Sequence, residues 1–257
     1  LMNYESARKA FPLSRWGDKT AIYDNTSLKS NQQSWTSVAL PYMEENGIAS
    51  MYDPSQAWHS QANRPAVSQT IKMFICPSVP TSNRADATYV KGAIAGDYGS
   101  VNGVKSGFWT YYPQLGPYPV ESRPPVVGVL NKYQDGNNAL LPACKIKNIT
   151  DGTSKTIMVA EDAGRPDAYD ANRKTTGAAV ANGIGWADPD NGYSLSKGNS
   201  NVMNNTNDSE VYSFHVGGAQ FCFADGSAHF LREAIDPLVF MALITRAGGE
   251  NIPPDSF

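Results

Sequence analysis

The stretch FHVGGAQFCFADGSAHFL, residues 214 to 231, predicts a β-hairpin near the end of the chain. Two runs rich in apolar and aromatic residues flank Asp225-Gly226, a pair that favours a two-residue turn with positive φ at both positions. Counting outward from that turn places three aromatic side chains together on the core face. These are Phe221, Phe223 and Phe230. The other face then holds Cys222 opposite His229.

His215 stands ahead of Asp225 in this stretch, and Ser227 follows closely. A catalytic serine needs a histidine in contact with it and an aspartate in contact with that histidine. A hairpin turn offers neither a strained nucleophile elbow nor nearby oxyanion donors. We therefore predict no catalytic residue here and interpret His215, Asp225 and Gly226 as a structural motif. In this motif the imidazole hydrogen-bonds the Asp225 carboxylate or nearby backbone.

Composition limits the classes of function. Of 257 residues, 41% are hydrophobic and 18% are charged, and the formal net charge is −3. Proteins that bind a nucleic-acid backbone usually carry a clear basic excess, so that class is excluded. The sequence has no apolar run of about 18 residues that could span a membrane. It starts at Leu1 within a helical pattern, which predicts a longer N-terminal helix in the full-length protein.

Three cysteines are too widely spaced for a zinc ribbon or a thioredoxin-type site. Cys222 alternates with phenylalanines in a strand, so we expect a buried or half-buried thiol. Cys76 and Cys144 remain as the pair better suited to a disulfide, provided that the compartment is oxidising. The sequence leaves open whether the two lie near enough to bond.

The expected fold is α+β, in a single domain over residues 1–257, with a truncated N-terminal helix packed on a largely antiparallel sheet and with β-rich and loop-rich insertions. Residues 1–80 form a helical part, residues 81–212 a loop-rich β region, and residues 213–257 the hairpin followed by a helix. The first ten residues have helical periodicity.

Capping residues mark the starts of two further helices. Ser34 is placed to cap a helix that Pro41 should kink or break, and Asp236 precedes Pro237 at the start of the C-terminal helix.

Five residues are candidates for binding a glycan or another small solute, because Tyr and Trp give large amphipathic contact area. They are the aromatic residues Trp109, Tyr111, Tyr112 and Trp186, together with Glu161. Such aromatic residues more often simply pack over a sheet. An enzyme is a further possibility. Four residues that could converge in space would then supply its general acid and general base. These are Glu161, Asp162, His215 and Asp225.

Asp188, Asp190 and Asn191 have the oxygen-rich chemistry of a calcium site, and Gly192 would permit a tight loop. The spacing does not fit an EF-hand, because the glutamate required at position twelve is absent. A looser calcium loop is the one cofactor site predicted. Clusters of Asp, Asn and Gly are otherwise commonly solvated turns.

Six segments, in order along the chain, resemble the DUF1559 family, also labelled solute-binding family 10, which is abundant in planctomycetes and related bacteria. They are LMNYESARKAFP, SWTSVALPYMEENGIASMYD, FICPSVP, ITDGTSKTIMVAED, FHVGGAQFCFADGSAHFL with its His-x9-Asp-Gly signature, and LITRAGGE. Each motif is weak, but their shared order is specific.

This resemblance implies a head similar to that of type IV pilins and type II secretion pseudopilins. In such proteins a basic leader and a hydrophobic helix precede the head. The resemblance therefore implies a non-enzymatic structural subunit on the periplasmic or extracellular face of the cell envelope. The subunit would be anchored in the inner membrane and partnered by other pilin-like subunits through the preceding helix. The alternative is an extracellular glycan- or solute-binding module.

Overall fold

A computed structural model gives the arrangement of most of the chain. It describes residues 1–17, 32–119, 126–131, 142–180, 183–198, 201–208, 210–253 and 256–257. Part of the loop-rich region expected between residues 81 and 212 lies outside these ranges.

The centre of the molecule is a five-stranded mixed sheet with the order β7-β3-β4-β8-β9. Its strands are β3 (Tyr98–Val104), β4 (Ile157–Glu161), β7 (Gly192–Leu195), β8 (Gly218–Phe223) and β9 (Ala228–Arg232). β3 and β7 are parallel, and the other neighbouring pairs are antiparallel. Two small antiparallel sheets pair β1 (Arg15–Trp16) with β2 (Gln33–Ser34), and β5 (Asp167–Tyr169) with β6 (Thr175–Ala179).

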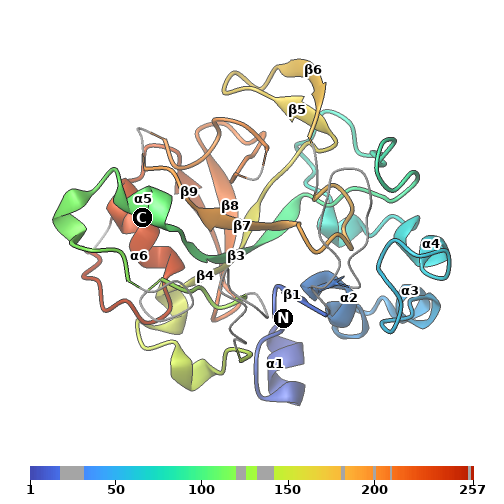
Figure 1. Cartoon of the computed structure of the whole chain (residues 1–257), viewed down its shortest axis with the longest axis horizontal. Coiled ribbons are helices and arrows are strands. Elements are labelled where there is room, and N and C mark those ends of the chain that lie inside the picture. Colours follow the sequence, from blue (N-terminus) through green and yellow to red (C-terminus); the bar gives the residue numbers. More distant parts are fainter. Residues whose placement is uncertain are drawn as a thin grey trace.

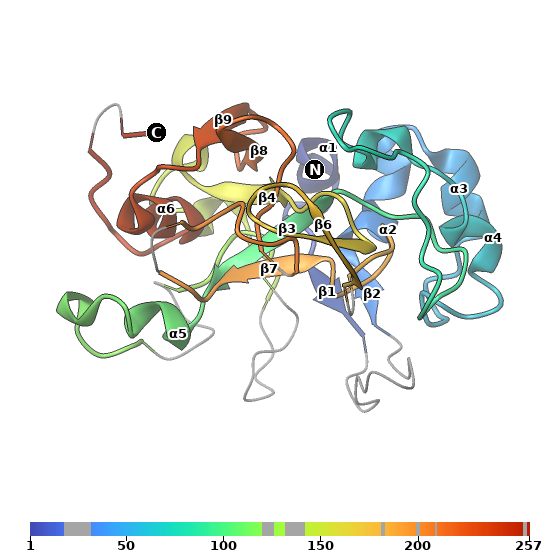
Figure 2. The ribbon, with the colours of Figure 1, turned by 90° about the horizontal axis from the view of Figure 1, so that it is seen from above.

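Helices flank the sheet at both ends. The α-helices are α1 (Met2–Arg8), α2 (Trp35–Ala39), α3 (Asn46–Met51), α4 (Arg64–Val67), α5 (Ser106–Trp109) and α6 (Pro237–Ile244). Short 3-10 helices are η1 (Leu40–Met43), η2 (Lys72–Phe74), η3 (Pro113–Leu115), η4 (Ile146–Asn148) and η5 (Thr153–Lys155). Figures 1 and 2 both place α2 to α4 at one end of the sheet and α5 and α6 at the other. The predicted α+β class is confirmed. Across the described ranges, no helix is long and apolar enough to cross a membrane.

The predicted caps and the predicted break are confirmed. The Ser34 side chain accepts a hydrogen bond from the backbone N–H of Thr36 at the start of α2. Pro41 lies where α2 gives way to η1, because proline cannot donate the hydrogen bond that would continue an α-helix. Asp236 accepts from the first turn of α6, and Pro237 is its first residue.

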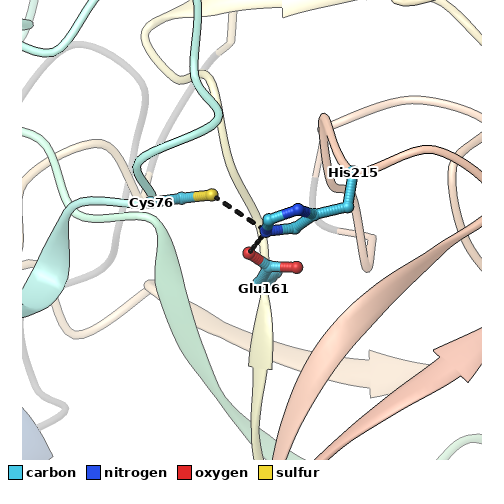
Figure 3. A group of neighbouring side chains, drawn as sticks. All are labelled: Cys76, Glu161 and His215. Atoms are coloured by element: carbon cyan, nitrogen blue, oxygen red, sulfur yellow. Dashed lines mark hydrogen bonds and ion pairs between the residues drawn. The ribbon is translucent and has the colours of Figure 1, made fainter.

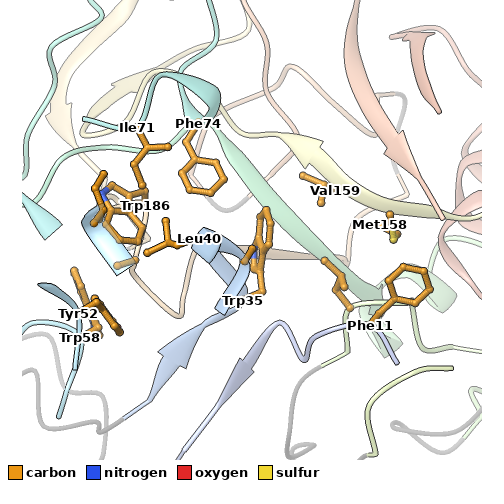
Figure 4. Close-up of a cluster of buried hydrophobic side chains, with 14 of the residues drawn as sticks. Phe11, Trp35, Leu40, Tyr52, Trp58, Ile71, Phe74, Met158, Val159 and Trp186 are labelled. Carbon is orange, nitrogen blue, oxygen red and sulfur yellow. The ribbon is translucent and has the colours of Figure 1, made fainter. Parts of the chain in front are cut away.

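Two hydrophobic clusters bury the two faces of the sheet. The first joins the helical end of the molecule to β4 and includes Trp35, Phe74 and Trp186 (Figure 4). The second packs α6 against β8, with Phe221 and Phe240 in edge-to-face contact.

The hairpin that joins β8 and β9 has a three-residue loop, so the predicted two-residue turn is wrong. The backbone N–H of Phe223 donates to Ser227 O at 2.9 Å, which leaves residues 224–226 in the loop. Gly226 has φ 89°, whereas Asp225 is not among the residues with positive φ. The Asp225 carboxylate instead accepts from both the N–H and the hydroxyl of Ser227, which stabilises a turn followed by a left-handed glycine.

The longer loop shifts the register by one residue. Phe221 pairs with His229, and Gln220 pairs with Phe230. Since neighbouring strand residues point to opposite faces, this shift moves Phe230 away from the core, and its side chain is 43% exposed. The prediction that Phe230 shares the core face with Phe221 and Phe223 is therefore wrong.

The expected disulfide between Cys76 and Cys144 is also wrong, because all three thiols are free. Cys144 is buried in the first hydrophobic cluster. The Cys76 sulfur instead faces His215. Cys222 is half-buried, as predicted.

Candidate functional site

Three chemically reactive side chains from distant parts of the chain meet at one point (Figure 3). Cys76 follows η2, Glu161 ends β4, and His215 precedes β8. His215 Nε2 lies 3.6 Å from Cys76 Sγ and 3.3 Å from Glu161 Oε1. The cysteine and the glutamate are fully buried, whereas the histidine side chain is 28% exposed. The cluster is therefore reached from solvent on the histidine side.

Asp97, which is fully buried, positions the cysteine. Its carboxylate accepts hydrogen bonds from the backbone N–H groups of Cys76 at 2.9 Å and of Gly164 at 3.0 Å. Arg84 Nη2 donates to both of its oxygens, at 2.7 and 2.6 Å. One carboxylate thus joins the segment after η2, the start of β3 and the segment after β4.

Glu161 is held by backbone on both sides. It pairs with Tyr98 across β3 and β4, and its Oε2 accepts from the backbone N–H of Gln220 at 2.7 Å. Its Oε1, in contrast, makes no regular hydrogen bond among the described residues, and its close polar neighbour is His215 Nε2 at 3.3 Å. Such an atom is uncommon, because buried polar atoms in folded proteins are almost always hydrogen-bonded.

Contacts around its ring and backbone orient His215. Its Nδ1 lies 3.1 Å from Ser78 Oγ, and its backbone N–H donates to Ser213 Oγ at 3.1 Å. Arg173 donates to its carbonyl oxygen at 2.9 Å. With Nδ1 occupied, Nε2 is the ring atom directed at the cysteine and the glutamate.

This geometry does not suit a nucleophile–base–acid relay. In such a relay the histidine uses one ring nitrogen for the nucleophile and the other for the acid. Here Cys76 and Glu161 both face Nε2. Burial, with smaller contributions from the charges of Glu161 and Asp97, raises the pKa of the Cys76 thiol to about 12. A protonated thiol is a poor nucleophile. A sulfur, a carboxylate oxygen and an imidazole nitrogen that converge are instead a donor set for a transition metal.

The predicted contact between His215 and Asp225 is wrong. Strand β8 separates them, and six residues at about 3.3 Å each span about 20 Å. Asp225 hydrogen-bonds Ser227 in the hairpin loop, and Ser227 Oγ lies 2.9 Å from His229 Nε2. The serine stands between the other two side chains, which is not the order of a catalytic triad.

The five candidates for solute binding lie in three places. Trp186 is in the core, where it stacks on Phe74 and its indole donates to Gln69 O at 3.1 Å. Glu161 belongs to the cluster with Cys76. The remaining three, Trp109, Tyr111 and Tyr112, lie at the end of α5 or just after it.

The four residues considered as acid and base do not all converge. Glu161 and His215 meet, whereas Asp225 lies at the far end of β8. Asp162 forms a buried ion pair with Arg165, with 2.7 Å between Oδ2 and Nη2.

Nitrogen donors already contact oxygens of the three calcium candidates. Asp188 accepts from the backbone N–H groups of Gly183 at 3.0 Å and of Asp190 at 2.8 Å. Asp190 pairs with Arg15, and Asn191 Oδ1 accepts from Arg165 at 3.1 Å. The calcium site stays a prediction.

Asp188 should make stability depend on pH. Burial, together with the nearby charge of Asp190, raises the pKa of this carboxyl to about 7. An unfolded aspartate has a pKa of about 3.9, so between about pH 4 and pH 7 the folded state holds the extra proton. The free energy of unfolding should therefore fall as pH rises through that window, by at most about 1.4 kcal/mol per pH unit for this group.

Urea unfolding of the wild type and of Asp188→Asn, in chelator from pH 4 to 8, isolates this contribution. The variant should gain stability relative to the wild type as pH rises to about 7, and the difference should then level off. A difference independent of pH, or one of opposite sign, would contradict this account of Asp188.

Cys76 and Ser78 were not predicted to belong to a site with Glu161 and His215, because no local spacing links them. The sequence nevertheless contains a signal that links these residues. FICPSVP contains the cysteine and Ser78, VAED contains the glutamate, and FHVGG contains the histidine. Each of these short runs lies within one of the segments that carry the family resemblance.

Comparison with known protein families gives a match. A sequence profile described as a protein of unknown function, DUF1559 (SBP_bac_10), matches residues 1–238. No curated protein and no solved structure matches. Since the profile covers most of the 257 residues, the chain belongs to the DUF1559 family.

Proposed function

We propose that this chain is a non-enzymatic structural subunit, the head of a pilus-like or type II secretion pseudopilus-like assembly. The observation that carries the non-enzymatic part is the sharing of His215 Nε2 between Cys76 and Glu161. That arrangement joins three segments of the chain but does not set up proton transfer to a nucleophile. The buried cluster is thus better suited to holding the head together than to turning over a substrate.

The position of α1 supports the assembly part of the proposal. None of its residues is buried. It touches the head through Tyr4, whose ring meets that of Tyr42 edge-on at 5.1 Å, and through Met2, which packs against Gly226 in the hairpin loop. A pilin-like head is connected to an N-terminal helix, and a surface helix that contacts the hairpin loop fits that role. The partners would be other pilin-like subunits at the outer face of the inner membrane.

The assembly role can be tested with the full-length gene in its native cell. Tagged full-length protein should fractionate with the membrane, and brief chemical cross-linking should give a ladder of homo-oligomers. A secreted form that holds only residues 1–257 should leave the membrane fraction and lose the ladder. A full-length protein that is released as a free monomer would contradict the assembly role.

An extracellular glycan- or solute-binding module is the alternative. The observation that favours it is Tyr111, which is 47% exposed and follows the half-buried Trp109 by two residues. Aromatic faces of this kind can stack on a sugar ring. Saturable glycan binding that Tyr111→Ala abolishes, with a free monomer in the cell, would favour the module over the assembly subunit.

A further inference from the structure

We propose that Cys76, Glu161 and His215 bind one divalent transition-metal ion, with zinc as the preferred ion. This site goes beyond the structural role above and does not depend on it. The ion would connect the segment after η2, the end of β4 and the loop before β8 (Figure 3).

The spacing of the donor atoms fits tetrahedral zinc. Zinc lies about 2.3 Å from a thiolate sulfur and about 2.0 to 2.2 Å from nitrogen or oxygen, so at tetrahedral angles S···N is roughly 3.6 Å and N···O roughly 3.4 Å. The separations here are 3.6 Å from Cys76 Sγ to His215 Nε2 and 3.3 Å from Nε2 to Glu161 Oε1. All three donor atoms lie within 4.8 Å of one another. Two of the three donor separations therefore match those of a tetrahedral zinc site.

A buried carboxylate oxygen without a regular hydrogen bond adds support. Glu161 is fully buried, and its Oε1 faces the cluster, where it makes no regular hydrogen bond among the described residues and lies 3.3 Å from His215 Nε2. A buried acceptor that is poorly hydrogen-bonded is costly, and a cation at the centre of the cluster would satisfy it.

The groups around the three donors hold them as the outer shell of a metal site does. Metal-bound histidines usually use their second ring nitrogen for a hydrogen bond, which fixes the ring. His215 places Nδ1 against Ser78 Oγ at 3.1 Å. Glu161 uses Oε2 for the N–H of Gln220 and leaves Oε1 for the ion.

The donor set selects the class of metal. Calcium and magnesium take oxygen ligands, whereas a thiolate with an imidazole favours zinc and its transition-metal neighbours. When the S–Zn bond forms, Cys76 releases its proton to solvent. Three protein ligands leave a fourth tetrahedral position, which a water molecule can fill because His215 is part-exposed.

Titration of the metal-free 257-residue chain with ZnCl2 and with CoCl2 tests this site. Calorimetry should give one zinc ion per chain. Cobalt should give the intense visible bands of tetrahedral Co²⁺ and a near-ultraviolet thiolate-to-cobalt charge-transfer band. Zinc at about 100 times its Kd should raise the folding equilibrium constant about 100-fold, and a chelator should reverse this.

Variants of the three donors separate this site from adventitious binding. Cys76→Ser should remove the charge-transfer band. His215→Ala and Glu161→Gln should weaken zinc binding by more than the roughly 10- to 100-fold expected for Ser78→Ala, which removes only an outer-shell partner. His215→Ala is the safeguard should Cys76→Ser fail to fold, since its side chain is part-exposed.

Two matched controls lie outside the cluster. Cys222→Ser removes a half-buried thiol and His229→Ala an exposed imidazole, and both variants should bind zinc like the wild type. A folded wild type that takes up no stoichiometric zinc or cobalt would overturn the proposal. Equal uptake by the wild type and the folded donor variants would overturn it too, because the ion would then bind elsewhere.

Discussion

Asp97→Ala should lower the free energy of unfolding by about 3 to 5 kcal/mol, which is the usual cost of leaving a buried charge without its partner. The substitution strands the Arg84 guanidinium, which is also buried. It also removes the acceptor of the Cys76 and Gly164 backbone N–H groups. The measurement is the urea unfolding midpoint, with the slope checked for two-state behaviour.

Asp53→Ala is the control, because Asp53 is an exposed aspartate that also accepts a backbone N–H, from Ser55. Its unfolding midpoint should stay close to that of the wild type. A loss below about 1 kcal/mol for Asp97→Ala, the size of one ordinary hydrogen bond, would mean that this carboxylate does not hold the site together.

Trp186→Ala should also cost about 3 to 5 kcal/mol, the range for truncating a large buried aromatic residue. The indole is 1% exposed, it stacks on Phe74, and its N–H donates to Gln69 O. Truncation would leave a cavity and an unpaired carbonyl. Thermal or urea unfolding measures the loss.

Tyr111→Ala supplies the comparison, since a half-exposed side chain away from the core should change stability by no more than about 0.5 kcal/mol. A Trp186→Ala variant that is as stable as the wild type but no longer binds a glycan or solute would identify Trp186 as a binding residue. It would also contradict the core position described here.

Local signals in the sequence predicted the local structure well. Ser34 and Asp236 cap helices, and Pro41 marks a break between helices, because each acts on backbone groups only a few residues away. Distant contacts are a different matter. The C-terminal helix ends at Ile244, and Arg246, just past it, donates to Asn131 Oδ1 at 2.9 Å, a distant partner that no local pattern reveals.

The hairpin shows that one extra loop residue changes the face of the sheet on which a side chain lies. The sequence indicates both strands and the turn between them. It does not distinguish a two-residue loop from a three-residue loop, because Asp-Gly suits either. The hydrogen bonds between Asp225 and Ser227 favour the longer loop, and the side chain of Phe230 then points away from the core.

The site itself could be predicted only in part. The sequence indicates Glu161 and His215 as candidates, but it favours a disulfide for their partner Cys76. The three meet because the sheet order brings β4 beside β8 and because Asp97 fixes the segment that carries the cysteine. Both are long-range features of the fold. The pairing of Cys76 with Cys144 rested on counting thiols, which carries no information about their positions.

X-ray absorption at the zinc edge of the zinc-loaded chain tests the metal site most directly. The proposed site predicts one sulfur at about 2.3 Å and nitrogen or oxygen ligands at about 2.0 to 2.2 Å, in four-coordinate geometry. Cys76→Ser should remove the sulfur from that shell. A first shell of nitrogen and oxygen alone in the wild type would contradict a site built from Cys76, Glu161 and His215.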